Sequence, residues 1–152
     1  MDIQITTFQH TCAIADIEGV HNLVHQQLTF IGYTPTMEDV QAVLANAMKQ
    51  ESRSVLFVAY QHNKALGIAF GNVCCGLESG GDYLWLNELY VAEEARVHGL
   101  GTQLLTEAQR WAKEHGCTYF AMVTHPKNER AQGLYAAEGF ELENLVWVDK
   151  YL

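Results

Sequence analysis

The sequence predicts a mixed α/β domain in which a mainly antiparallel, twisted sheet is flanked by helices. Two β-rich runs, residues 54–60 and 65–73, are separated by a short polar turn, which is typical of an antiparallel hairpin. Strand-like and helical runs alternate from residue 83 onward, and this order favours parallel pairing. The length of 152 residues lies near the commonest domain size, so we expect a single domain over residues 1–152.

The first 50 residues predict one strand and two helices. Ile3, Ile5 and Thr7 alternate with polar residues, as in a half-buried strand. Residues 13–30 predict a helix, and Thr36 is placed to cap a second one. The apolar positions at helical spacing in the first helix are Ile17, Val20, Leu23, Val24 and Leu28.

The second half of the chain is organised around one long helix. Gly116 is placed to end it in the left-handed conformation that glycine adopts most readily. Its predicted inner face consists of Leu100, Leu104, Leu105, Ala108, Trp111 and Ala112. The other predicted elements are a glycine-rich loop over 76–82, a strand over 83–91, a buried strand over 117–124, a helix over 128–138 ended by Gly139, and a final strand over 145–151.

Charge and apolar run lengths exclude several function classes. The net charge of -9 disfavours general binding to nucleic acid, which rests on Lys and Arg neutralising phosphates, and favours a cationic partner. The longest apolar run, residues 55–60, is far shorter than the roughly 20 residues of a membrane helix. Residues 1–10 lack the pattern of a secretory signal, so we expect a cytoplasmic protein. We also expect its cysteines to be reduced.

The sharpest local signal is a glycine-containing connection between the strand that ends near Val91 and the long helix. Gly99 and Gly101 lie where backbone N–H groups at a helix N-terminus can converge on an anion. The dinucleotide fingerprint would require a glycine at Leu104, and the P-loop requires a Gly-Lys-Ser/Thr run that is missing. The residues alone leave two interpretations, a phosphate site or an ordinary tight turn.

Two ordered blocks resemble the GCN5-related N-acetyltransferase (GNAT) family. The family signature Gln/Arg-x-x-Gly-x-Gly/Ala is matched by Arg96-Val97-His98-Gly99-Leu100-Gly101. Residues 128–140 match a second block, Asn-x-x-Ala-x-x-Leu-Tyr followed by Gly-Phe. The resemblance covers about residues 83–140, whereas residues 2–51, where such enzymes usually build much of the acceptor pocket, carry no matching motif.

The resemblance implies the acyl-CoA N-acyltransferase fold, with splayed fourth and fifth strands, and acetyl-CoA as the cosubstrate. It also implies transfer of the acetyl group to a primary amine in a ternary complex. The matching branch includes polyamine, amino-acid and histone-type acetyltransferases, so a polyamine, an amino acid or a basic peptide is the expected acceptor. The residues that would hold the cofactor are Leu89, Tyr90, Val91, Arg96, Val97, His98, Gly99, Leu100, Gly101, Thr102 and Asn128.

Tyr135 is the candidate general acid. Amine attack on the thioester releases CoA as a thiolate, and a phenol with a pKa of about 10 at the sulfur can donate a proton to it. The competing interpretation is that Tyr135, with Ala131 and Leu134, forms the inner face of an amphipathic helix. The family match favours the catalytic role.

Glu88 is the candidate general base, because it lies in a mainly apolar strand three residues before Val91. An ammonium group with a pKa near 10.4 must lose a proton before it attacks, and burial would raise the pKa of a carboxylate and its strength as a base. Strict alternation would place Glu88 on one face with Leu86 and Tyr90. On the same pattern Asn87 would share the other face with Trp85 and Leu89. The competing interpretation is a charge paired across the sheet or exposed at its end.

Other site types are disfavoured. His21 and His25 share a helix face without a third ligand at a recognisable spacing, and Cys74 and Cys75 point to opposite faces of a strand, so we expect no metal. A catalytically silent acyl-CoA sensor is the main alternative, and a nucleotide-binding switch is another. The apolar stretch over 145–151 further suggests a homodimer.

Overall fold

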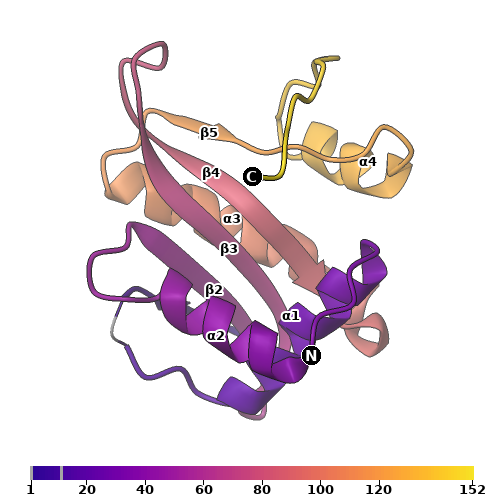
Figure 1. Cartoon of the computed structure of the whole chain (residues 1–152). Coiled ribbons are helices and arrows are strands. Elements are labelled where there is room, and N and C mark those ends of the chain that lie inside the picture. Colours follow the sequence, from indigo (N-terminus) through magenta and orange to yellow (C-terminus); the bar gives the residue numbers. More distant parts are fainter. Residues whose placement is uncertain (1, 11) are drawn as a thin grey trace. The chain divides into compact units, whose positions relative to one another are not determined.

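The computed structural model describes residues 2–10 and 12–152, which form two compact units, 1–122 and 123–152. The first unit contains the sheet, and the second contains one helix followed by irregular chain. The elements, labelled in Figure 1, are β1 (Gln4–Phe8), α1 (Ile17–Phe30), α2 (Met37–Ala47), β2 (Ser54–Gln61), β3 (Lys64–Gly76), β4 (Gly81–Val91), a 3-10 turn η1 (Glu93–Ala95), α3 (Leu100–Glu114), β5 (Tyr119–Ala121) and α4 (Glu129–Ala137).

The sheet has the mixed topology that the sequence predicts. Its five strands lie in the order β1-β2-β3-β4-β5, with antiparallel pairing up to β4 and parallel pairing between β4 and β5. Helices α1 and α2 cover one face, and α3 covers the other (Figure 1). Residues 54–60 of β2 are therefore buried on both faces, and the core is centred on this strand.

The β2–β3 connection is a two-residue hairpin turn. His62 and Asn63 both have positive φ, 48° and 62°, as a type I′ turn requires. This turn matches the right-handed twist of the flanking strands and fixes their register. The predicted hairpin is confirmed.

The predicted helix starts are correct for α2 and four residues early for α1. Thr36 caps α2 and forms a reciprocal capping box with Asp39, as expected from a Thr with an acidic residue three positions later. In α1 the cap is Asp16, in the left-handed conformation, and its carboxylate accepts from Gly19 N at 3.2 Å and from Ala65 N at 2.8 Å. The second bond ties the start of α1 to the start of β3.

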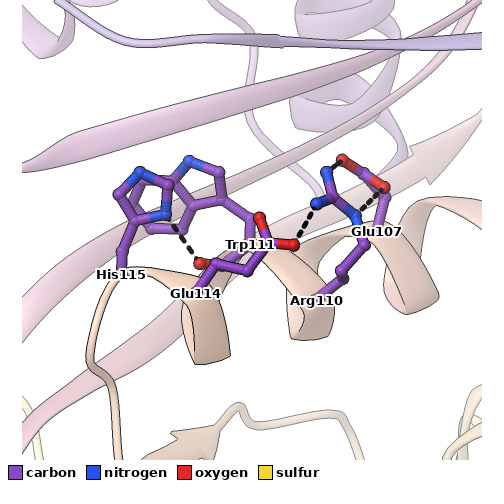
Figure 2. A network of polar contacts seen from close by, with 5 residues as sticks. All are labelled: Glu107, Arg110, Trp111, Glu114 and His115. Carbon is purple, nitrogen blue, oxygen red and sulfur yellow. Dashed lines mark hydrogen bonds and ion pairs between the residues drawn. The ribbon is translucent and has the colours of Figure 1, made fainter.

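Helix α3 has the predicted buried face and a polar outer face. Trp111 packs edge-on against Phe57 of β2, with ring centroids 6.1 Å apart, and stacks on His115 at 4.1 Å. On the outer face Arg110 binds Glu107 and Glu114, as Figure 2 shows. Gly116 follows the helix with a φ of 81°, so its predicted role as the stop residue is confirmed.

The end of the chain differs from the sequence prediction. Strand β5 covers three residues rather than 117–124, and Tyr119 is exposed. Residues 145–151 form no strand, so that prediction is wrong: apolar, β-prone residues become a strand only where a neighbouring strand supplies hydrogen bonds. Helix α4 is confirmed between its Asn128 cap and Gly139, whose φ is 89°. None of the helices in the described residues is long and apolar enough to cross a membrane.

Candidate active site

The loop before α3 has the backbone conformation of an anion site. Val97 and Gly99 both have positive φ, 68° and 75°, on either side of His98. Such alternation turns successive N–H groups toward one side of the chain. A valine in the left-handed region is strained, and backbone strain of this kind clusters at functional sites. Gly99 caps α3 without a side-chain hydrogen bond, and helical pairing begins at Gln103 N, which donates to Gly99 O. The N–H groups of the first turn therefore lack an intrahelical acceptor.

The second half of β4 has one unpaired edge within the first unit. Residues 89–91 pair with 67–69 of β3 on one side. On the other side β5 pairs only with residues 83–85 of β4, in parallel register. Pairing between the two strands therefore ends at Trp85 and Ala121. The splay of the fourth and fifth strands that the family resemblance implies stays a prediction.

A β-bulge interrupts β4 just after the residues that pair with β5. Phe70 of β3 pairs with Glu88, and the next residue, Gly71, pairs with Leu86. Asn87 is therefore an extra residue without a partner on β3. A bulge shifts the alternation of every later side chain by one position.

The bulge corrects the predicted faces of β4. Glu88 contacts α1, and Tyr90 follows it on the same face, as expected. Leu86 is on the opposite face, toward α3, and is 3% exposed. The prediction that Glu88 shares a face with Leu86 is wrong, because it assumed strict alternation.

The same shift separates Asn87 from Leu89. Asn72, which pairs with Trp85, donates its side-chain amide to Asn87 Oδ1 at 2.8 Å. Asn87 therefore lies on the face of Trp85, as predicted, while Leu89 lies on the other face, contrary to prediction. Asn87 and Glu88 consequently project from the same face of the sheet.

Glu88 is a half-buried carboxylate held by one neutral donor. Gln27 of α1 donates its side-chain N–H to Glu88 Oε2. Burial raises the pKa of Glu88, and the Gln27 hydrogen bond acts in the opposite direction. Burial is the larger of the two influences, so the Glu88 carboxylate is a stronger base than an exposed glutamate.

The Arg96 side chain folds back over β4. Its Nε donates to the Val91 carbonyl at 3.0 Å, and its guanidinium carbon lies 5.5 Å from the Tyr90 ring centroid and 5.9 Å from that of Phe30. These contacts connect the loop to β4 and to the end of α1. A direct contact between Arg96 and cofactor phosphate stays a prediction.

The second unit carries the two remaining predicted residues. Asn128 caps α4 by accepting from Ala131 N at 3.1 Å, so its side-chain oxygen already has a structural partner. Tyr135 is 8% exposed, and its ring packs edge-on against Phe140 with centroids 6.2 Å apart. Burial raises the pKa of Tyr135, which keeps the phenol protonated through the neutral range. The role of Asn128 in cofactor binding stays a prediction.

The first unit therefore brings together Glu88, residues 89–91 and residues 96–102, and the second unit holds Asn128 and Tyr135 on one helix. Gln27 was not predicted from the sequence. It occupies a buried helix position that continues the apolar spacing of Val20 and Leu23. A polar residue at an apolar helix position needs a buried partner, and this was the sequence signal that could have identified Gln27.

The chain is similar to known acetyltransferases. Residues 17–140 match the model of the acetyltransferase (GNAT) family. An aminoglycoside N(6')-acetyltransferase type 1 from Serratia marcescens is 41% identical over 69 residues, which are 45% of this chain and 47% of that protein. An uncharacterised N-acetyltransferase from Bacillus subtilis, YhfO, is 25% identical over 84% of this chain and 85% of its own length.

Solved structures show the same fold. A probable acetyltransferase superposes with a TM-score of 0.82 at 24% identity, over 98% of this chain and 96% of that one. The aminoglycoside N-acetyltransferase AAC(6')-Iy, solved with CoA, gives a TM-score of 0.78 at 22% identity, over 99% and 96% of the two chains. At these identities the likeness establishes the fold.

Proposed function

The chain belongs to the acetyltransferase (GNAT) family and is an acetyl-CoA-dependent N-acetyltransferase, and we propose that its acceptor is a primary amine on a small polycationic molecule of the aminoglycoside class. The observation that carries the proposal is Glu88, a half-buried carboxylate on the α1 face of β4, beside the strand edge that the bulge and the short β5 leave open. Relatives named for aminoglycoside acetylation support this acceptor class.

The charge distribution supports a cationic acceptor. The first 48 residues, which include α1 and α2, contain no Lys or Arg. A segment with only negative formal charge attracts an ammonium group and disfavours an acidic acceptor. Its acidic residues are Asp2, Asp16, Glu18, Glu38 and Asp39.

In the proposed reaction Glu88 removes a proton from the acceptor ammonium, directly or through one water. The proton passes to a carboxylate oxygen, and the free amine lone pair attacks the thioester carbon. Backbone N–H near Leu89 or Tyr90 polarises the carbonyl oxygen on which negative charge develops. The tetrahedral species then collapses: the C–S bond breaks, the thiolate leaves, and the attacking nitrogen releases its second proton to solvent as the neutral amide forms.

Tyr135 supplies the proton that the departing thiolate needs. Its buried phenol and its place in the second family block support this assignment. Direct attack requires no covalent enzyme intermediate, so none of the cysteines takes part. The cofactor is held by the N–H groups of Val97 to Thr102 around its pyrophosphate and by backbone pairing of residues 89–91 with its pantetheine arm.

Free thiol release from acetyl-CoA, measured against a panel of amines, tests this proposal. The panel contains aminoglycosides, polyamines, amino acids and lysine peptides, each at several concentrations. We expect the highest kcat/KM with an aminoglycoside. Turnover only on an amino acid or a peptide would contradict the acceptor class, and tight acetyl-CoA binding without turnover on any amine would favour the sensor.

Quaternary structure and location are further predictions. We propose a homodimer in the cytoplasm, and the homodimer draws support from the exposed apolar side chains of Leu145, Val146 and Val148. Light scattering at micromolar concentration is expected to give twice the mass of one chain. The mass of a single chain would contradict the dimer.

A further inference from the structure

We propose that Gln27 is a positioning residue for the general base: its buried amide fixes Glu88 Oε2 and leaves Oε1 as the atom that receives the proton of the acceptor. The inference rests on the proposed role of Glu88 and assigns a part of the reaction to α1, a segment that carries no recognisable motif. It predicts that the proton-accepting step depends on a residue 61 positions away in the sequence.

Gln27 is a polar side chain in a buried position. Gln27 is 7% exposed and continues the inner face of α1 formed by Val20 and Leu23. Burying a side-chain amide without a partner is costly, and an apolar residue at this position would serve packing equally well. A polar residue here is therefore explained by its hydrogen bond to Glu88.

Gln27 is an uncharged hydrogen-bond donor to Glu88. A Lys or Arg partner would pair with Glu88 as an ion, hold its pKa low and weaken it as a base. A positive charge would also repel a cationic acceptor. A neutral amide stabilises the carboxylate moderately and occupies only one of its two oxygens.

Helix α1 is held by contacts at both of its ends. At its start the Asp16 carboxylate binds Ala65 N at 2.8 Å, and the Tyr60 hydroxyl donates to Ala15 O at 2.6 Å. At its end Arg96 lies over the Phe30 ring. A helix held in this way can position an amide against a strand with little freedom.

Among residues 2–10 and 12–152, no charged side chain takes the place of Gln27 as the partner of Glu88. Burial is the larger influence on the pKa of Glu88 and Gln27 is the second. His25 of α1 is engaged elsewhere, with Nε2 3.1 Å from Pro35 O. The ionisable or charged residues of the first unit on the elements that pack on this face are Glu18, His21 and His25 of α1, Glu38 and Asp39 of α2, Tyr60 of β2, Cys74 of β3, Tyr83 and Tyr90 of β4, and Arg96.

The test is a carboxyl carbon NMR titration of the full chain, with Glu88 assigned by the loss of its signal in Glu88→Gln. Gln27→Met keeps the length and burial of the side chain and removes the donor, and Gln26→Met, on the exposed side of α1, is the matched control. We expect the Glu88 midpoint to move to higher pH in Gln27→Met and to be unchanged in Gln26→Met. An unchanged midpoint in Gln27→Met would overturn the inference, whether or not an acceptor is known.

Kinetics separates this inference from the proposed function. With the best amine of the panel, we expect Gln27→Met to lower kcat/KM about tenfold near pH 6.5, with a smaller loss at pH 9. In the Glu88→Gln background the same change should have no further effect. If Glu88→Gln retains full activity, the role of Glu88 fails; if only the dependence on Gln27 is missing, the positioning role alone fails.

Discussion

The proposed cofactor side and the proposed acceptor side of the first unit are built in different ways. The cofactor side is backbone, namely the loop around Val97 and Gly99, the first turn of α3, and the unpaired edge of β4. The acceptor side is a contact between two side chains, Gln27 and Glu88, from elements distant in sequence. A backbone site needs glycines at fixed spacing and is visible as a motif, whereas a side-chain site needs only compatible residues wherever the fold brings them together.

The largest expected effect is on the acceptor side. Glu88→Gln should lower kcat on the best amine about 100-fold or more, because a positioned base contributes on the order of 10²–10⁴. The acetyl-CoA Kd should stay within about threefold of the wild-type value, since that site is backbone. Steady-state kinetics and calorimetry check both values, with Glu94→Gln on the exposed η1 turn as the control. A large loss of acetyl-CoA affinity would contradict the separation of the two sides.

We also expect Glu88→Gln to change how the stability of the folded chain depends on pH. Burial raises the pKa of Glu88, so the folded chain binds this proton more tightly than the unfolded chain does. The stability of the wild type should therefore fall as pH rises from the ordinary carboxyl pKa through the raised one. Glu88→Gln removes this loss, and its Tm at pH 7.5 should exceed that of the wild type. Scanning calorimetry that finds a clearly lower Tm would contradict the stated cause of the pKa shift.

The next effect concerns the leaving thiolate. Tyr135→Phe keeps the buried ring and removes the proton donor, so kcat should fall about 10- to 100-fold while the Tm changes little. Tyr151→Phe, an exposed tyrosine of the same unit, is the matched control. Stopped-flow measurement of thiol release checks the rate. Equal rates for the two variants would restrict Tyr135 to a packing role.

A smaller effect is expected from the cofactor loop. Gly99 and Gly116 both have positive φ, 75° and 81°, and an added Cβ would meet no atom within 4 Å at either position. Alanine should therefore cost about 1–2 kcal/mol of conformational strain at each. Only Gly99→Ala should also weaken acetyl-CoA binding, about tenfold, in a calorimetric titration. Equal Kd values for the two variants would contradict the placement of the pyrophosphate.

The smallest effect concerns how α1 is held. Asp16→Ala removes the cap of α1 and the bond to Ala65 N, so the free energy of unfolding should fall by about 1–2 kcal/mol. Thr36→Ala removes the cap of α2, at a similar cost and without touching α1. The acceptor KM should rise more in Asp16→Ala than in Thr36→Ala. Urea titration and initial rates measure both effects, and equal KM values would argue against a role for α1 in acceptor binding.

The difference between the two sides also explains what the sequence could predict. Hydrophobic periodicity, helix-capping residues and the positions of glycines predicted the hairpin, α2, α3 and α4, because each of these signals is local in the sequence. The bulge at Asn87 and the partner of Glu88 depend on pairing between strands and on packing between elements, so they have no local signature. The predicted strand over 145–151 failed for the related reason that β-propensity does not create a pairing partner.

The most direct test of the central claim is a single-turnover experiment with stoichiometric acetyl-CoA, in which mass spectrometry follows both the amine and the intact chain. We expect an acetylated aminoglycoside amine in the presence of acceptor and an unmodified chain at every time point, with or without acceptor. Accumulation of an acetylated chain before acceptor is added would contradict direct attack in a ternary complex. Bound acetyl-CoA that is never transferred to any cationic amine would contradict the proposed acceptor.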